Sequence, residues 1–93
     1  MKPSIVVERR YPNDATVFRV TTIGPRRLRD TYGVHPASDG VYRVDGQCQV
    51  FDGTVLVRAT SPEEAVRKVA ERVAEAIAAG KPAWQFDQNG LES

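Results

Sequence analysis

Apolar and polar residues alternate in two stretches at the start of the chain, and this pattern predicts a β-hairpin. The stretches Ser4–Tyr11 and Thr16–Ile23 are rich in β-branched and aromatic residues and flank the turn-forming tripeptide Pro-Asn-Asp. A four-residue loop, Pro12–Ala15, would place Val7 opposite Val20. One face of the hairpin would then be apolar and would consist of Ile5, Val7, Phe18 and Val20.

Strand-forming residues between positions 41 and 59 are interrupted twice by an Asp-Gly pair, which predicts a three-stranded meander. Asp-Gly between strand formers favours a type I′ turn, because both central residues of that turn need a positive φ. Turns at Asp45-Gly46 and Asp52-Gly53 would place one face against the core, made of Val41, Arg43, Cys48, Val50, Val55, Val57 and Ala59. The opposite face would carry Tyr42, Val44, Gln47, Gln49, Phe51, Thr54, Leu56 and Arg58.

The segment after this meander has the pattern of an amphipathic helix with a defined start and end. Ser61 is expected at the N-cap, Pro62 at the first helical position, and Glu64 would complete a capping box. Gly80 and Pro82 are expected to end the helix. Its apolar stripe comprises Val66, Val69, Ala70, Val73, Ala76 and Ile77.

Strands followed by one long helix predict a single α+β domain over residues 1–93. We expect a two-layer fold, in which a mostly antiparallel sheet of five or six strands packs one face against the helix. Residues 31–40 are expected to form a loop. Trp84 and Phe86 are spaced as in a short sixth strand or a docking tail. The ordered core would cover residues 4–87, with a frayed tail at 88–93.

Composition narrows the class of protein. The chain has 93 residues, a net charge of +1 and one cysteine, Cys48, so no internal disulfide can form. No apolar run is long enough to cross a membrane, and the first residues do not form a secretory signal, so we expect a cytoplasmic protein. Charge is uneven: residues 1–46 carry eight basic against five acidic residues, and residues 47–93 carry five against seven. A mildly basic N-terminal half therefore remains an option for binding.

Catalytic chemistry has little support in the sequence. The chain has one histidine, His35, and its pairing with Asp39 would supply only two metal ligands. Cys48 is predicted to face the core, where a thiol is unreactive. No glycine-rich phosphate loop is present. We expect a protein that is not an enzyme, with no metal and no cofactor.

Two surfaces are candidates for binding. The first is the connector Gly24–Gly33, where a short helical turn anchored by Leu28 and Tyr32 would expose Arg26, Arg27 and Arg29. With Arg9 and Arg10 these arginines would form a cluster suited to carboxylates or phosphates, partly neutralised by Asp30. The second is the sheet face opposite the helix, with Tyr42, Phe51, Leu56 and Arg58. The alternatives are a solvated connector and a solvated sheet face with isolated apolar residues.

The string VLVRATSPEEAVRKVAERV (Val55–Val73), a strand that leads directly into a capped helix, resembles a pattern of small phage and mobile-element accessory proteins. Anti-CRISPR proteins are similar in build, with a few antiparallel strands, one helix and no catalytic apparatus. The resemblance implies a protein that occupies a surface of a larger assembly, although this chain is slightly basic where many such proteins are acidic.

The expected function is therefore that of a small protein–protein inhibitor or adaptor. One alternative is a weak nucleic-acid-binding module that uses the arginine-rich connector. A second alternative is a subunit of a homo-oligomeric or phage structural assembly that self-associates through a strand edge.

Overall fold

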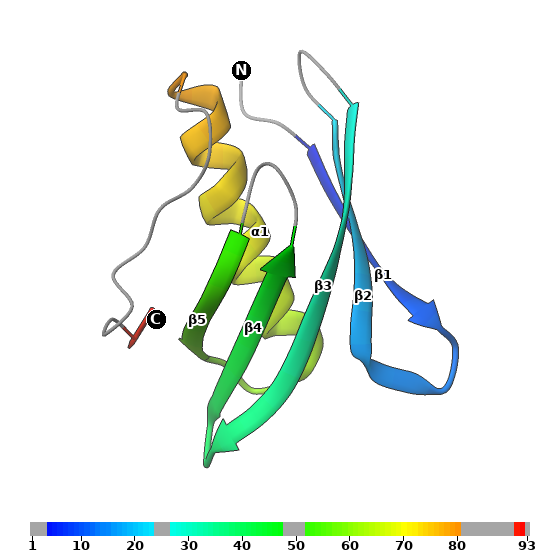
Figure 1. The fold of residues 1–93 in the computed structure, drawn as a ribbon, viewed down its shortest axis with the longest axis vertical. Helices are drawn as coiled ribbons and strands as arrows, with labels where there is room; N and C mark the ends of the chain where they lie inside the picture. The colour runs from blue at the N-terminus through cyan, green and yellow to red at the C-terminus, as the bar shows by residue number, and fades with distance from the viewer. Residues whose placement is uncertain (1–3, 24–26, 48–51, 81–90, 93) are drawn as a thin grey trace.

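A six-stranded sheet with one helix across one of its faces makes up the fold (Figure 1). The computed structural model describes residues 4–23, 27–47, 52–80 and 91–92. Its elements are β1 (Ser4–Tyr11), β2 (Asp14–Ile23), β3 (Arg27–Ser38), β4 (Val41–Gln47), β5 (Asp52–Arg58), α1 (Pro62–Ala78) and β6 (Leu91–Glu92). The strands lie in chain order; β1 to β5 are antiparallel and β6 is parallel to β5. The predicted α+β fold is confirmed.

The hairpin of β1 and β2 has the predicted register but a tighter turn. Val7 lies opposite Val20 and Glu8 opposite Arg19, whereas Tyr11 pairs with Asp14 after a bulge in which three residues of β2 lie against Arg10 alone. The prediction of a four-residue loop is therefore wrong. The Asp14 carboxylate accepts hydrogen bonds from the hydroxyl and the backbone N–H of Thr16, and these bonds lower its pKa.

Arg27–Ser38, which covers the described part of the arginine-rich connector and most of the expected loop at 31–40, forms one long strand, β3, paired with β2 on one side and β4 on the other. The helical turn predicted after Pro25 is not formed in the described part of this segment. Tyr32 and Val34 are buried with 0% and 1% of their surface exposed, so alternate residues of β3 enter the core. Pro36 is tolerated because it lies next to a bulge near the strand end.

The turn between β3 and β4 is made by another Asp-Gly pair, Asp39-Gly40, between the paired residues Ser38 and Val41. Gly40 has a φ of 71°, and no non-glycine residue among those described has a positive φ. The turn therefore uses the conformational freedom of one glycine, and it is not of the type I′ kind.

Asp45-Gly46 and Asp52-Gly53, which were predicted to be turns, lie inside β4 and β5. Gly46 is paired with Gly53 and Asp45 with Thr54. This register reverses the predicted faces at Val44, which is fully buried, and at Arg43, which is exposed, whereas Val41 is buried as predicted. The residues between the two strands, 48–51, lie outside the described part of the chain, as do the predictions made for Cys48 and Val50.

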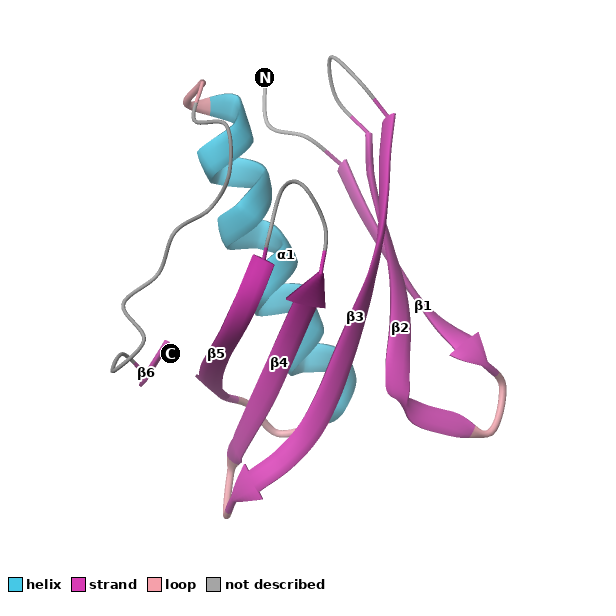
Figure 2. Ribbon diagram, viewed as in Figure 1, coloured by secondary structure: helices cyan, strands magenta, loops and turns pink. Residues whose placement is uncertain are grey.

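Helix α1 packs as predicted and has Ser61 at its N-cap (Figure 2), but the predicted capping box is replaced by bonds from Thr60, one residue before the N-cap, to the Glu64 carboxylate. The Ser61 hydroxyl accepts a hydrogen bond from the backbone N–H of Glu64 at 3.2 Å, which is the N-cap interaction. The Glu64 carboxylate bonds back to the hydroxyl of Thr60 at 2.8 Å, and this bond is the main cause of its lowered pKa. The predicted stripe is buried at Val66, Val69, Ala70, Val73 and Ala76; the side chain of Ile77 is not described.

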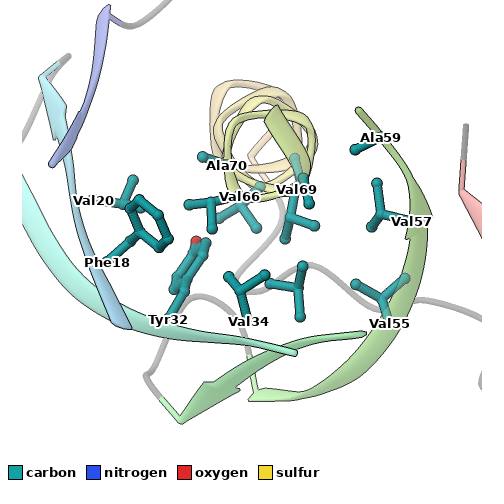
Figure 3. Close-up of a cluster of buried hydrophobic side chains, with 14 residues drawn as sticks. Phe18, Val20, Tyr32, Val34, Val55, Val57, Ala59, Val66, Val69 and Ala70 are labelled. Atoms are coloured by element: carbon teal, nitrogen blue, oxygen red, sulfur yellow. The ribbon is translucent and has the colours of Figure 1, made fainter. Parts of the chain in front are cut away.

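The core lies between the helix and one face of the sheet (Figure 3). Phe18, Tyr32 and Val34 lie beneath Val66, and Val55 and Val57 line the other side of the same cluster. The expected strand near Trp84 and Phe86 falls outside the described residues. Leu91 and Glu92, expected to be frayed, pair instead with Leu56 and Val57 of β5.

Candidate docking surface

The two faces of the sheet differ in what covers them. Helix α1 contacts β1 through β5 on one face, where Phe18, Val20, Tyr32, Val34, Val44, Val55 and Val57 are buried. In the described part of the chain, no element packs on the opposite face (Figure 1). Because successive side chains of a strand point to opposite faces, this open face carries the residues between the buried ones. On β3 these are Arg27, Arg29, Thr31, Gly33 and His35.

Three arginines lie together at one end of the open face. Arg27 and Arg29 are exposed on β3, opposite Ile23 and Thr21 of β2. Arg19 lies diagonally from Arg29, opposite Thr31 on β3 and opposite Glu8 on β1. Diagonal neighbours on adjacent antiparallel strands are about 7–8 Å apart, within the reach of arginine side chains. We call Arg19, Arg27 and Arg29 the arginine group.

Asp30 does not neutralise this group. It alternates with Arg29 along β3, so it belongs to the same side as Tyr32, facing the helix layer. The predicted helical pair of Arg26 and Asp30 required a turn that β3 replaces, and Arg26 lies outside the described residues. Arg27 and Arg29 make no ion pair with any residue that the structure describes.

Arg9 and Arg10 do not join the arginine group. Arg9 Nε lies 3.3 Å from Glu63 Oε1 of the helix, which places this side chain on the covered side of the sheet. Arg10 donates a hydrogen bond to the hydroxyl of Tyr11 at 3.2 Å, with its guanidinium 5.7 Å from the ring centre. Arg27 is aligned with the Ser4 end of β1, five residues or about 17 Å from Arg9 along the strand. The predicted cluster of five arginines is therefore not formed.

A second polar group on the open face surrounds Asp45, and sequence reasoning missed it. The hydroxyl of Thr54 donates a hydrogen bond to Asp45 Oδ1 at 2.9 Å, and Arg43 Nε lies 3.4 Å from the same oxygen. His35 Nε2 lies 3.6 Å from Asp45 Oδ2. The contacts arise because His35 is opposite Arg43 and Gly33 is opposite Asp45 in the β3–β4 ladder. Because Asp45-Gly46 is typical of a turn, the sequence did not indicate that Asp45 lies on a strand beside His35 and Arg43.

Four residues on the open face were predicted to be candidates for binding, and the structure places two of them on that face. The four are Tyr42, Phe51, Leu56 and Arg58. Tyr42 is half-buried and packs against the core, so its assignment to the open face was wrong. Phe51 lies outside the described residues. Leu56, 39% exposed, is on the open face opposite Arg43, and Arg58 is exposed two pairs further along, opposite Val41. Arg27 and Arg29 of the connector thus lie on the open sheet face, so the two predicted surfaces are one surface in the described part of the chain.

The described part of this surface is basic. It carries Arg19, Arg27, Arg29, Arg43 and Arg58 against the acidic residues Glu8 and Asp45. Asp45 is held by Arg43 and Thr54, and Glu8 lies beside Arg19, so the charge of Arg27 and Arg29 has no acidic neighbour in the described ladders. Such guanidinium groups are suited to carboxylates or phosphates.

Within the described residues, no three His, Cys, Asp or Glu side chains come together as metal ligands, and no helix has the length and hydropathy that a membrane crossing requires. No protein-family model, curated protein sequence or solved structure matches this chain.

Proposed function

We propose that this chain is a non-enzymatic binding protein that docks a carboxylate-rich surface of a larger protein on its open sheet face. The observation that carries the proposal is the placement of Arg27 and Arg29, beside Arg19, on the sheet face that no described element covers. A sheet holds such side chains on a rigid base, so less conformational freedom is lost on binding than from a loop.

The composition of the face supports a protein partner. Arginine is enriched at protein interfaces because it combines a charged, bidentate donor group with an apolar stem. Leu56 and Ile23, 39% and 44% exposed, supply apolar contacts on the same sheet. The role is that of an inhibitor or adaptor of the phage or mobile-element kind, acting by occupying a site on its partner.

A nucleic-acid partner is less well supported. Single-stranded nucleic acids are bound by aromatic side chains that stack on the bases, and sheets that bind RNA present such residues. Tyr42 packs against the core, and no aromatic side chain is described on β2 to β5 of the open face.

Charge reversal on the open face tests the proposal. We would titrate poly-L-glutamate into ¹⁵N-labelled protein at low and moderate salt and compare wild type with Arg29→Glu. The expected result is amide shifts on β2 and β3, with binding weakened by about tenfold or more in Arg29→Glu. The control is Arg67→Glu, the same charge change at an exposed position of α1.

Several outcomes would overturn the proposal. Equal weakening by Arg29→Glu and Arg67→Glu would show attraction to overall charge, and shifts confined to α1 would place binding elsewhere. A mixed-sequence DNA duplex of equal charge is titrated in parallel. Tighter binding to DNA than to polyglutamate, with affinity falling steeply as salt rises, would favour the nucleic-acid alternative.

A further inference from the structure

The two edges of the sheet differ in whether a further strand pairs with them. The edge at β5 is covered by β6, whose residues Leu91 and Glu92 pair with Leu56 and Val57. The edge at β1 has no such cover, because β1 pairs with β2 and with no other described strand. Backbone N–H and C=O groups along an uncovered edge strand are available to pair with another chain.

The first half of β1 lacks the usual protection of an edge strand. Charged residues, which discourage pairing between edges, occur only in its second half, at Glu8, Arg9 and Arg10. The first half, Ser4–Val7, has none. Val6 is 41% exposed, and Ile23, on the neighbouring strand opposite Ser4, is 44% exposed. Apolar surface and unpaired backbone therefore coincide at this corner of the sheet.

We propose that β1 pairs antiparallel with β1 of a second copy of this chain, about a two-fold axis that places Val6 opposite Val6. Residues paired across an antiparallel ladder point to the same face of the sheet. An isologous dimer with both helices on one side must therefore pair open-face residues with open-face residues. Pairing Val6 with its own copy meets this condition and aligns Ile5 with Val7 on the covered side.

Three other registers of the same symmetry, with Val7, Glu8 or Arg9 on the axis, are less favourable. With Val7 on the axis, Ile5 would face Arg9 and Val6 would face Glu8, so apolar side chains would pair with charged ones. With Glu8 or Arg9 on the axis, like charges would lie directly opposite each other, which is destabilising. With Val6 on the axis, Glu8 faces the hydroxyl of Ser4, and the three central pairs are aliphatic.

The pairing extends the core of each copy. Ile5 and Val7 are half-buried and already pack against the hydrophobic cluster, so an added strand would cover the part of them that faces the edge. Both open faces would lie on the same side of one continuous sheet. The surface that carries the arginine group would thereby be presented twice, but the dimer does not depend on the function proposed above.

Sedimentation velocity over a range of protein concentrations tests the dimer. Wild type is expected to shift from monomer to dimer as the concentration rises. Val6→Lys should raise the dissociation constant by about tenfold or more, because two like charges replace the valine pair on the axis. Leu56→Lys is the matched control, since Leu56 has nearly the same exposure, 39% against 41%, and lies across the sheet from β1. Unchanged thermal unfolding of both variants, measured at a concentration where wild type is monomeric, would show that the fold is retained.

Cysteine cross-linking tests the register, with Cys48 replaced by serine throughout. Val6→Cys should form a disulfide-linked dimer under mild oxidation much faster than Glu8→Cys, whose copies would lie four residues apart along the ladder. A protein that stays monomeric at every concentration would overturn the proposal. So would a dimer weakened by Leu56→Lys and not by Val6→Lys, or faster cross-linking at position 7 or 8 than at position 6.

Discussion

Replacing Val44 with alanine tests the register that joins β4 to β5. The Val44 side chain is 0% exposed and lies opposite Val55 beneath the helix. Alanine removes two methyl groups, which costs about 1.6 kcal/mol at about 0.8 kcal/mol for each buried carbon. The cavity left behind raises the expected loss in the free energy of unfolding to about 2–3 kcal/mol.

The alternative register predicts a different result for the same change. If Asp45-Gly46 were a hairpin turn, Val44 would lie on the open face, and the alanine variant would lose about 0.5 kcal/mol or less. Arg43 would then face the core. In the structure Arg43 is half exposed and its Nε lies 3.4 Å from Asp45, so Arg43→Ala is expected to cost about 1 kcal/mol at most.

Urea unfolding, followed by circular dichroism, measures both variants. A lower midpoint with an unchanged slope for Val44→Ala reports lost stability in the same folded state. Leu56→Ala is the control on the exposed side of the adjacent strand, where the loss should be clearly smaller than for Val44→Ala. A small loss for Val44→Ala together with a large loss for Arg43→Ala would refute the observed register.

Three further predictions concern single positions. Gly40→Ala is expected to lower stability by about 1–2 kcal/mol in urea unfolding, since a φ of 71° is costly for any residue with a Cβ; no loss would show that the turn adopts another conformation. Ser61→Ala should cost about 1 kcal/mol through the lost N-cap bond, and Ser61→Thr should retain most of the stability. The pKa of Glu64 is lowered in the folded state, mainly by the hydrogen bond from the Thr60 hydroxyl. The Glu64 carboxylate therefore stabilises the fold fully at a pH above its ordinary pKa of 4.5, and this stabilisation is lost as the pH falls through the lower pKa of the folded state. The stability difference between wild type and Glu64→Gln should therefore shrink on acidification, and a difference that stays constant with pH would contradict this reasoning.

The neighbours of Arg27 and Arg29 depend on whether their segment is a helical turn or a strand. As a helical connector, Gly24–Gly33 would have presented its arginines apart from the sheet, with Asp30 among them. In the structure, strand β3 (Arg27–Ser38) places Arg27 and Arg29 on one face and Asp30 on the other. The arginines therefore remain candidates for binding an acidic partner, with different neighbours: Arg19, Thr21 and Ile23.

The helix and the first hairpin were predictable from the sequence alone, because their signals are local. Ser61 and Gly80 mark the two ends of the helical segment, and the valines and alanines between them recur at helical spacing. In the hairpin, alternation places Val7 and Val20 on one face, and a shift by one residue would expose them both. That is why the register was correct even though the turn was not.

Strand β3 and the pairing of β4 with β5 were decided by tertiary structure. The polar residues and Pro36 around Val34 are typical of a loop, and this segment becomes a strand because β2 and β4 pair with it on both sides. Asp-Gly favours a turn only locally, whereas burying a valine gains about 1.5–3 kcal/mol. The register that buries both Val44 and Val55 under α1 therefore prevails, and it gathers the arginines of β2, β3 and β4 on the opposite face.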